Sequence, residues 1–390
     1  MKPISLMVSI ACTLIICANN GFANDLLLNL GPEELVKAGG IDIDVGDYSV
    51  PSFVDWNNDN LKDLVIGQGS GASPPGKVRV YLNVGTESNP QFSNFFYAQS
   101  NGVDLTCTAG GCMGCVPRVV YWNRDEPNNL KDLLVGHADG TVKIFLNKGT
   151  DESPTFDGGT FLQVGQPGAK KNIDVGDRAT PTVVDWNNDG KKDLVVGGLD
   201  GRIHIFLNGG TDTTPDFFTE AFAQASGSPL IVPSSRSSPV ILDLDGDGKK
   251  DLLTGNTNGQ LLFYSNMNTD QSPLFSTNYL LVESNGVPIA IAGSPRTRPF
   301  VCDWTGDGYL DVLIGVSDGK VHLYQSIPQV GDLDKDYDVD FIDFALFANY
   351  WQQADCDKCG GADLAGNDSY VDYDDLQQLV ENWLAGIPTP

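Results

Sequence analysis

The sequence is poor in basic residues and holds almost no histidine. Its 390 residues include 24 Lys and Arg against 51 Asp and Glu, with three His, for a formal net charge of -27. A surface this acidic is repelled by phosphate backbones and by anionic lipid headgroups, so we expect no nucleic-acid partner and no adsorption to membranes. The imbalance favours cations as ligands.

Long apolar runs are missing beyond the N-terminus, so we expect a protein that does not span a membrane. Lys2 precedes a mostly apolar run over residues 4–17, and small residues lead to Ala23. This pattern predicts a secretory signal over residues 1–23, cleaved after Ala23. A lipoprotein anchor would need a small residue before Cys17, where Ile16 stands. The sequence therefore predicts a secreted protein, extracellular or at the cell surface.

The scarcity of histidine also bears on the cysteines beyond the signal. Three lie in the loop "TCTAGGCMGC", one lies in an apolar run and two form "CDKC": Cys107, Cys112, Cys115, Cys302, Cys356 and Cys359. A zinc site would need four thiolates, or added histidines, at a tight spacing. We expect instead one disulfide within the loop, a short Cys356–Cys359 bridge and a core thiol at Cys302.

Glycine is abundant, and a repeated unit organises most of the chain. The 44 glycines favour a turn-rich all-β fold. The string "PSFVDWNNDNLKDLVIG" at Pro51 returns in related form at Pro117, Pro181, Pro239 and Pro299, at spacings of 66, 64, 58 and 60 residues. Such spacings suit four-stranded propeller blades with long outer loops. We therefore predict an all-β, five-bladed β-propeller of four-stranded blades over residues 24–325.

Local chemistry assigns strands within each unit. Runs such as "TVV" and "LVV" flank an acidic loop, and an Asp-Gly or Asn-Gly hairpin turn leads to an alternating third strand. His204 and His322 occupy the polar middle of that third strand, which predicts solvated rim residues and no catalytic role; no nucleophile pattern accompanies His137 either. The fifth unit ends after its third strand, so the segment before Pro51 is expected to supply the missing outer strand and close the ring.

The acidic loop has the spacing of a calcium site. The fourth unit reads "DLDGDGKKD", which places oxygen ligands at loop positions 1, 3, 5 and 9 and glycine at position 6. Calcium takes six to eight oxygen ligands, and alternate residues of a tight loop can supply them. Four units share this pattern, and their predicted ligands are Asp55, Asn57, Asp59, Asp63; Asp185, Asn187, Asp189, Asp193; Asp243, Asp245, Asp247, Asp251; and Asp303, Thr305, Asp307, Asp311. The second unit has Tyr121 at position 1 and three extra residues, so we expect it to have lost its ion. The alternative is that all of these loops are solvated turns that bind no ion.

This pattern resembles the FG-GAP (VCBS) repeat family, known from integrin-type propellers and from some sugar-binding lectins. The resemblance covers roughly residues 40–325 and implies a propeller with structural calcium loops. That family includes adhesion proteins, lectins and enzyme-associated modules, so the resemblance implies a fold more sharply than an activity.

The last 60 residues differ from the rest. After a linker at residues 326–330, residues 331–386 hold a duplicated acidic loop, each copy followed by a helical pattern, and residues 387–390 form a tail. Predicted loop ligands are Asp332, Asp334, Asp336, Asp340 and Asp343 in the first copy, and Asp363, Asn367 or Asp368, Asp372 and Asp375 in the second. Leu346, Phe347 and Tyr350, with Leu376, Leu379 and Trp383, are expected to form the helix core.

Two calcium loops, each followed by a helix, resemble a type I dockerin, the module that docks secreted polysaccharide-degrading proteins onto cohesins. The resemblance implies a small α-helical, paired EF-hand-type loop-helix domain with a cohesin-type partner, and partner-binding residues at loop positions 10 and 11, here Phe341, Ile342, Tyr373 and Asp374. Two departures stand out. Tyr337 occupies position 6, where glycine normally permits the turn, and the second loop has one extra residue.

Three functions remain open at this point. The leading hypothesis is a secreted, non-catalytic calcium-binding propeller that recognises a polysaccharide, a glycoprotein or another protein and is attached through its tail in the context of polysaccharide degradation. A polysaccharide-cleaving hydrolase or lyase is the rival, since propellers can present paired acids in the central cavity. The conspicuous acids here already belong to calcium loops. A purely structural surface adhesin is the third.

Overall fold

The computed structural model describes residues 26–107, 110, 113–123, 130–293, 295–354, 358–366 and 368–383. The predicted signal lies outside these residues. Leu28–Pro328 forms one compact unit, and Gln329–Pro390 belongs to a second. Within the described residues no helix is long and apolar enough to cross a membrane.

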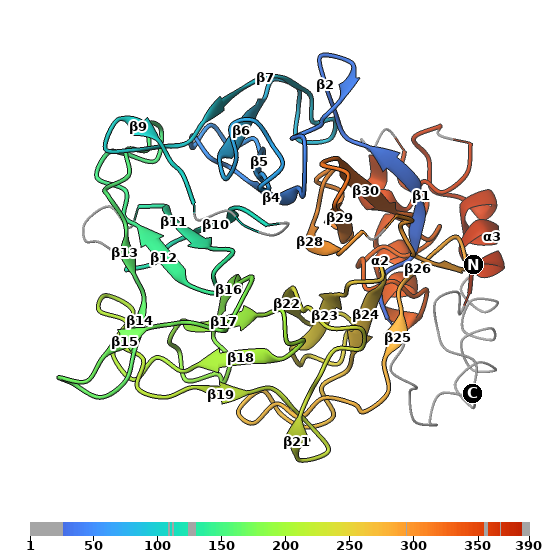
Figure 1. Cartoon of the computed structure of the whole chain (residues 1–390). Coiled ribbons are helices and arrows are strands. Elements are labelled where there is room, and N and C mark those ends of the chain that lie inside the picture. The colour runs from blue at the N-terminus through green and yellow to red at the C-terminus, as the bar shows by residue number, and fades with distance from the viewer. Residues whose placement is uncertain are drawn as a thin grey trace. The chain divides into compact units, whose positions relative to one another are not determined.

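The first unit is an all-β propeller of five blades, each a four-stranded antiparallel sheet (Figure 1). In chain order the blades are β4 (Val50–Val54), β5 (Asp63–Gly67), β6 (Val78–Asn83) and β7 (Phe92–Tyr97); β10 (Val116–Val120), β11 (Asp132–Gly136), β12 (Val142–Phe145) and β13 (Thr160–Phe161); β16 (Thr180–Val184), β17 (Asp193–Gly197), β18 (Ile203–Phe206) and β19 (Ala221–Phe222); β22 (Pro239–Leu242), β23 (Asp251–Gly255), β24 (Leu261–Tyr264) and β25 (Leu280–Leu281); and β28 (Arg298–Cys302), β29 (Asp311–Gly315), β30 (Val321–Ser326) and β1 (Leu30–Leu35). The predicted five-bladed, four-stranded architecture is confirmed.

Short strands extend the outer edges of the blades. They are β2 (Lys37–Ala38), β3 (Ile41–Asp42), β8 (Gln99–Ser100), β9 (Val103–Asp104), β14 (Gln163–Val164), β15 (Lys171–Asn172), β20 (Gln224–Ala225), β21 (Ser228–Pro229), β26 (Glu283–Ser284) and β27 (Val287–Pro288). Pairing β2 with β7 and β26 with β1 links neighbouring blades at their rims. These two pairs cover the outer strands of the first and last blades, which limits edge-to-edge association there, whereas β8–β9, β14–β15 and β20–β21 form separate two-stranded sheets.

The ring closes because a strand from the start of the propeller sequence pairs with one from its end. Strand β1 pairs antiparallel with β30, with Glu34 opposite Leu323 and Leu35 opposite His322. The N-terminal segment thus supplies the fourth strand of the last blade, as the incomplete fifth repeat predicted.

A glycine at the end of each second strand allows the blades to pack against one another. A Cβ atom at Gly67 would lie 2.0 Å from the carbonyl oxygen of Cys115 in the next blade. Equivalent contacts of 2.0 to 2.4 Å recur around the ring at Gly67, Gly136, Gly197, Gly255 and Gly315, the last against Ser49 of the first blade. No side chain fits at this distance, which explains the glycine that ends every repeat.

Hydrophobic cores lie between the blades rather than within them. The second strand is buried at every residue in all five blades. A tryptophan after the first strand packs against a phenylalanine of the following blade, with ring centroids 5.6 to 6.1 Å apart, in the pairs Trp56–Phe156, Trp122–Phe217, Trp186–Phe275 and Trp304–Phe92. These contacts join the blades by burial of aromatic surface.

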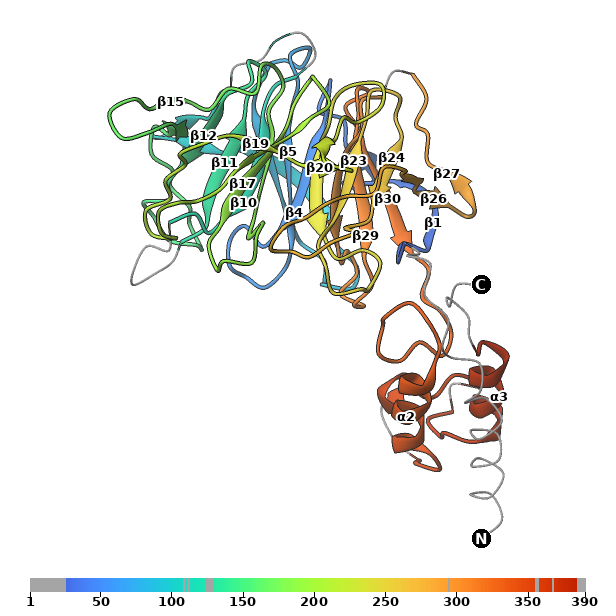
Figure 2. The ribbon, with the colours of Figure 1, turned by 90° about the horizontal axis from the view of Figure 1, so that it is seen from below.

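The second unit contains two short helices and a 3-10 turn. They are α2 (Phe341–Tyr350), η1 (Lys358–Gly361) and α3 (Tyr373–Glu381), and both α-helices are seen in Figure 2. Phe347 and Leu379 are fully buried in its core, as their helical spacing predicted. Phe344, Tyr350 and Leu376 pack against that core, whereas the predicted Leu346 and Trp383 do not belong to it.

Candidate functional site

The four predicted calcium loops adopt one conformation. The position-1 aspartate accepts a hydrogen bond of 2.8 to 3.0 Å from the backbone N–H of position 6 in every loop, in the pairs Asp55–Asn60, Asp185–Gly190, Asp243–Gly248 and Asp303–Gly308. The position-5 aspartate accepts from the N–H of position 7, at 2.8 to 3.0 Å. Position 6 has a positive φ in all four, between 69° and 93°. This left-handed conformation favours glycine and asparagine, the residues found at position 6 of these four loops.

The position-9 aspartate is a buried acceptor in each of these loops. One oxygen of Asp63 accepts from Trp56 N–H at 2.8 Å, and the other accepts from Asn83 N–H at 2.7 Å, at the end of the third strand. Asp193, Asp251 and Asp311 repeat both bonds. Burial raises the pKa of Asp63, Asp193 and Asp311 to about 6 and the pKa of Asp251 to about 7.

The second blade keeps this aspartate although its loop differs. Asp132 is fully buried and accepts from Trp122 N–H at 3.3 Å and from Asn147 N–H at 2.8 Å. The predicted loss of calcium there concerns a loop that includes residues 124–129, which lie outside the described residues. The buried acceptor at position 9 is therefore common to all five blades.

Several loop oxygens are shielded from solvent and accept no hydrogen bond. They are Asp55 Oδ1, Asn57 Oδ1, Asp245 Oδ2 and Thr305 Oγ1, at positions 1 and 3 of three loops. In the fourth blade, one oxygen each of Asp243, Asp245 and Asp251 lies within 4.8 Å of the others. Carboxylate, amide and hydroxyl oxygens gathered in this way suit a hard divalent cation.

Lysines that we did not single out from the sequence link these loops around the ring. Lys131 Nζ donates to the Asp55 carbonyl at 2.6 Å, and Lys62 Nζ donates to the Asp303 carbonyl at 3.2 Å. Lys192 reaches the Tyr121 carbonyl, and Lys250 reaches Asn188 Oδ1. Each lysine stands just before the position-9 aspartate and contacts the loop of the preceding blade. The recurrence of this lysine in the strings "LKD" and "KKD" is the sequence feature that could have predicted these contacts.

Asp343 and Asp375, the predicted ligands that close the two tail loops, have equivalent environments, and the predicted Asn367 lies outside the described residues. Asp343 is fully buried and accepts from the N–H groups of Leu333, Asp334 and Asp340 at 2.6 to 3.2 Å. Asp375 accepts equivalent bonds from Leu364, Ala365 and Asp372. Asp340 and Asp372 are the N-caps of α2 and α3, each in a capping box. The duplication seen in the sequence is thus repeated in the hydrogen bonding.

The first tail loop concentrates negative charge. Oxygens of Asp332, Asp334 and Asp343 lie within 4.8 Å of one another, as do those of Asp336, Asp338 and Asp343. Burial, then neighbouring carboxylates, raise the pKa of Asp334 to about 6 and that of Asp338 to about 7. In the second loop, Asp363 accepts from Ser369 N–H at 3.0 Å through Oδ2, while its Oδ1 is buried without a partner.

Tyr337 makes the turn at which glycine was expected. Its φ is +74°, and its N–H donates to Asp332 Oδ2 at 2.9 Å. Its side chain is only 8% exposed. The loop thus keeps its turn without glycine at position 6.

The predicted partner-binding residues are exposed and equivalent in the two halves. Phe341, Ile342, Tyr373 and Asp374 lie at the first two positions of α2 and α3 and are all exposed. The Phe341 ring meets Trp383 edge-on at 5.3 Å, and the Tyr373 ring meets Trp351 in the same way at 5.3 Å. Each helix start therefore contacts the tryptophan that follows the other helix.

The prediction that the two strand histidines are solvated is wrong. His204 and His322 are 5% and 4% exposed. Each ring lies between two carboxylates, Glu220 and Asp200 for His204, and Glu33 and Asp318 for His322. An outer-strand glutamate and a turn aspartate cover each histidine, which a strand pattern alone does not reveal.

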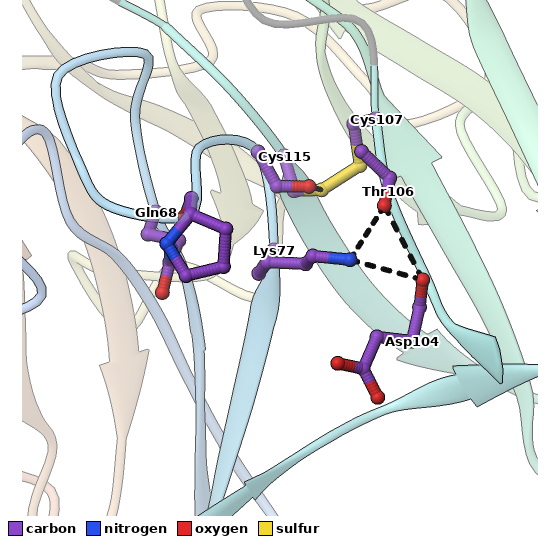
Figure 3. Close-up of a disulfide and its surroundings, with 8 residues drawn as sticks. Gln68, Lys77, Asp104, Thr106, Cys107 and Cys115 are labelled. Carbon is purple, nitrogen blue, oxygen red and sulfur yellow. Dashed lines mark hydrogen bonds between the residues drawn. A yellow bond between two sulfur atoms is a disulfide. The ribbon is translucent and has the colours of Figure 1, made fainter.

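The predicted loop disulfide is present. Cys107 and Cys115 are bonded, and beside them Lys77 Nζ donates to Thr106 Oγ1 at 2.7 Å and to the Asp104 carbonyl at 3.2 Å (Figure 3). Cys302 is a free thiol that packs against the core between the last and first blades. Cys359 is disulfide-bonded, and Cys112 and Cys356 lie outside the described residues.

A cleft of ligand size opens where the last and first blades meet. Its volume is about 780 Å³, and its lining includes Glu34, Lys37, Asp42, Gln91, Trp304 and Gln325. Ligand sites in proteins commonly have volumes of roughly 300 to 1,000 Å³.

Comparisons with known proteins bear mainly on the fold. No curated protein matches this chain. A Photorhabdus luminescens Tc holotoxin structure is 12% identical over 79% of this chain, with a TM-score of 0.38, and this chain covers only 15% of that one. An Agrocybe aegerita lectin that recognises non-reducing terminal N-acetylglucosamine is 19% identical over 71% of this chain and 63% of its own, with a TM-score of 0.37. A GH43_1 enzyme from Xanthomonas citri is 12% identical over 74% of this chain and 90% of its own, with a TM-score of 0.44. Likeness at this level says nothing about ligand or activity.

The sequence of the repeats is more informative. Residues 185–254 and 243–314 match the family described as FG-GAP-like repeat. These matches span the calcium-type loops of the third, fourth and fifth blades. The chain therefore carries FG-GAP-like repeats within a five-bladed β-propeller.

Proposed function

We propose that this protein is a secreted, non-catalytic calcium-binding module whose propeller recognises a glycan or a protein and whose tail attaches it to a partner. The observation that carries the calcium assignment is the set of buried loop oxygens without hydrogen-bond partners, at Asp55, Asn57, Asp245 and Thr305. A buried oxygen without a partner is costly unless a cation contacts it.

Calcium would stabilise the loop end of the four blades that carry the predicted ligands. The loop residues that would hold it are those at positions 1, 3, 5 and 9, and the ion would offset the repulsion among their carboxylates. Each position-9 aspartate already fixes the loop to the third strand, so this chain's own residues form much of the site before an ion arrives.

Recognition rather than hydrolysis is the propeller function that we favour. Glycosidases need two acids that flank a scissile bond, whereas the conspicuous carboxylates here lie in the calcium-type loops. The cleft between the last and first blades offers a volume of ligand size beside Trp304. The context of polysaccharide degradation rests on the resemblance of the tail to a dockerin.

Attachment through the tail is supported by its duplicated geometry. Two loops end in capped helices, and four exposed residues occupy equivalent helix starts. Exposed aromatic side chains, here Phe341 and Tyr373, are enriched at protein interfaces. We infer a cohesin-type protein as the partner. The Cys107–Cys115 disulfide agrees with an oxidising, extracytoplasmic location.

The mature chain tests these assignments directly. Isothermal titration with calcium after chelation should give several binding events, and thermal stability should rise with calcium. Affinity electrophoresis and reducing-end assays on a panel of plant and algal polysaccharides should show binding without turnover. Turnover that survives controls would replace the binding function with an enzymatic one, and neither binding nor turnover would favour a structural adhesin.

A further inference from the structure

The end of the propeller axis opposite the calcium-type loops is lined by arginine. The inner strands β4, β16, β22 and β28 run from this end to the loops, and β4, β10, β16, β22 and β28 lie nearest the centre (Figure 1). Three residues before the repeat proline stand Tyr48, Arg178, Arg236 and Arg296, all with positive φ between 45° and 62°. Three consecutive blades therefore present arginine from one structural position. In the sequence these arginines lie just before the proline that begins each repeat.

These arginines converge on one cavity. Its lining includes Arg178, Arg236, Arg296 and Arg298, which are four of the eight arginines in the chain. Arg298 is 4% exposed. In a chain with a net charge of -27, such a gathering of guanidinium groups at one point is the reverse of the general trend, and it points to an anionic ligand.

Hydroxyl groups complete the lining, and one of them has no partner in the protein. Thr180 Oγ1 donates to the Ser237 carbonyl, Ser237 Oγ donates to the Arg202 carbonyl and Thr297 Oγ1 donates to the Gln260 carbonyl. Ser238 is 3% exposed, and its Oγ makes no hydrogen bond. A buried hydroxyl that lines a cavity without a partner is available to a ligand.

Neighbouring groups hold the arginines in place. The guanidinium carbons of Arg296 and Arg298 lie 5.1 and 5.5 Å from the centre of the Tyr48 ring, at cation–π distance. The carboxylate of Asp47 interacts electrostatically with Arg298 and Arg296, and it is itself fixed by a 2.7 Å bond from Gly71 N–H. The second blade contributes Met113, which is buried inside the loop closed by Cys107–Cys115.

The size of the cavity limits what can enter. Its volume is about 20 Å³, which corresponds to about one or two water-sized atoms at roughly 10 to 15 Å³ each. A sugar ring does not fit, but the two oxygens of a carboxylate do. The planar guanidinium also matches a carboxylate through paired N–H groups.

We propose that this cavity binds a single carboxylate that a larger ligand presents at the mouth of the axis. The inference rests on the proposed recognition of a glycan by the propeller, and it narrows that glycan to an acidic, uronate-type polysaccharide. The site itself is defined by its arginines and Ser238, whether or not the ligand is a polysaccharide.

Calorimetric titration of the mature full-length protein tests the site with sodium glucuronate, with glucose as the neutral sugar and with sodium sulfate. We expect millimolar binding of glucuronate, no binding of glucose and weaker binding of sulfate. Arg236→Gln and Ser238→Ala should weaken glucuronate binding at least tenfold. Arg202→Gln, which removes the same charge from the rim, should leave it within twofold. Ser238→Ala should keep the wild-type melting temperature, because its hydroxyl makes no bond within the protein.

The outcomes separate the site from the proposed function. Absence of glucuronate binding, equal loss in Arg202→Gln, or sulfate binding tighter than glucuronate would each overturn the carboxylate site. If a polysaccharide binds wild type and Arg236→Gln equally well, the recognition function stands and the carboxylate site falls. If glucuronate binds through Arg236 but no polysaccharide binds, the site stands and the polysaccharide ligand falls.

Discussion

Glu33 and His322 lie 2.7 Å apart, from Oε1 to Nδ1, although 289 residues separate them in the chain. Glu33 belongs to β1 and His322 to β30, the two strands whose pairing closes the ring. Tyr324 also donates to the second oxygen of Glu33 at 3.3 Å. The joint between the first and last parts of the propeller therefore contains a titratable pair.

This pair predicts a pH dependence of ring closure. Burial alone would lower the pKa of His322, but its hydrogen bonds and charge interactions with Asp318 and Glu33 outweigh burial and raise the pKa. A raised folded pKa stabilises the fold below the unfolded pKa of about 6.5, and this stabilisation is lost as the pH rises through the folded pKa. Glu33→Gln should therefore cost about 1 to 2 kcal/mol of unfolding free energy at pH 6 and less at pH 8.5.

Denaturant unfolding at the two pH values, with calcium saturating, measures this difference. Glu34→Gln is the matched control, because it makes the same change at the next residue of β1, which is paired with Leu323 and faces the opposite side of the strand. An equal cost of Glu33→Gln at both pH values would contradict a charged pair at the closure.

The fold was predictable to the extent that it is written into the repeats. The proline, the acidic loop and the terminal glycine recur in all five repeats, at one spacing in four of them, so the blade number and the origin of the closing strand followed from the sequence. The environment of His322 could not be predicted, because Glu33, which covers it, lies 289 residues away in the sequence. The axial arginines were visible in the sequence at one position, but only ring geometry brings Arg178, Arg236 and Arg296 to one cavity.

Calcium should stabilise the propeller more at pH 8 than at pH 5.5. Burial, partly opposed by two backbone N–H bonds, raises the pKa of Asp251 from its ordinary value of 3.8 to about 7. Without metal, the raised pKa makes protonated Asp251 contribute to the free energy of unfolding below pH 3.8. This contribution is lost as the pH rises through about 7. A bound cation reverses this penalty for the ionised form. Melting temperatures with calcium and with chelator at both pH values check the prediction, and a calcium effect that is equal or larger at pH 5.5 would contradict it.

Asp132→Asn should destabilise the protein independently of calcium. The Asp132 carboxylate accepts from Trp122 and Asn147 N–H groups, and an amide NH₂ in place of one oxygen would face a backbone donor. We expect a cost of about 1 to 3 kcal/mol, the usual effect of an unsatisfied buried group. Urea unfolding with and without calcium measures it. The matched change Asp251→Asn, in a loop with calcium-type ligands, should cost more with calcium than without; the same calcium-dependent excess in Asp132→Asn would show that the second blade also binds the ion.

Asp343→Asn and Asp375→Asn should destabilise the tail by similar amounts. Each carboxylate is buried and accepts three backbone N–H bonds, two from its own loop and one from the residue that caps its helix. Each substitution replaces one carboxylate oxygen by an amide NH₂ group, which cannot accept a hydrogen bond. We therefore expect either variant to lower the free energy of unfolding by roughly 2 kcal/mol. The aromatic pairs Phe341–Trp383 and Tyr373–Trp351 join the two halves, so near-ultraviolet circular dichroism and tryptophan fluorescence of the full chain report the change. Because Leu28–Pro328 is a separate compact unit, the propeller transition should stay at its wild-type temperature. A large effect from one variant and none from the other would mean that the two loops, despite equivalent hydrogen bonds, do not contribute equally to the fold.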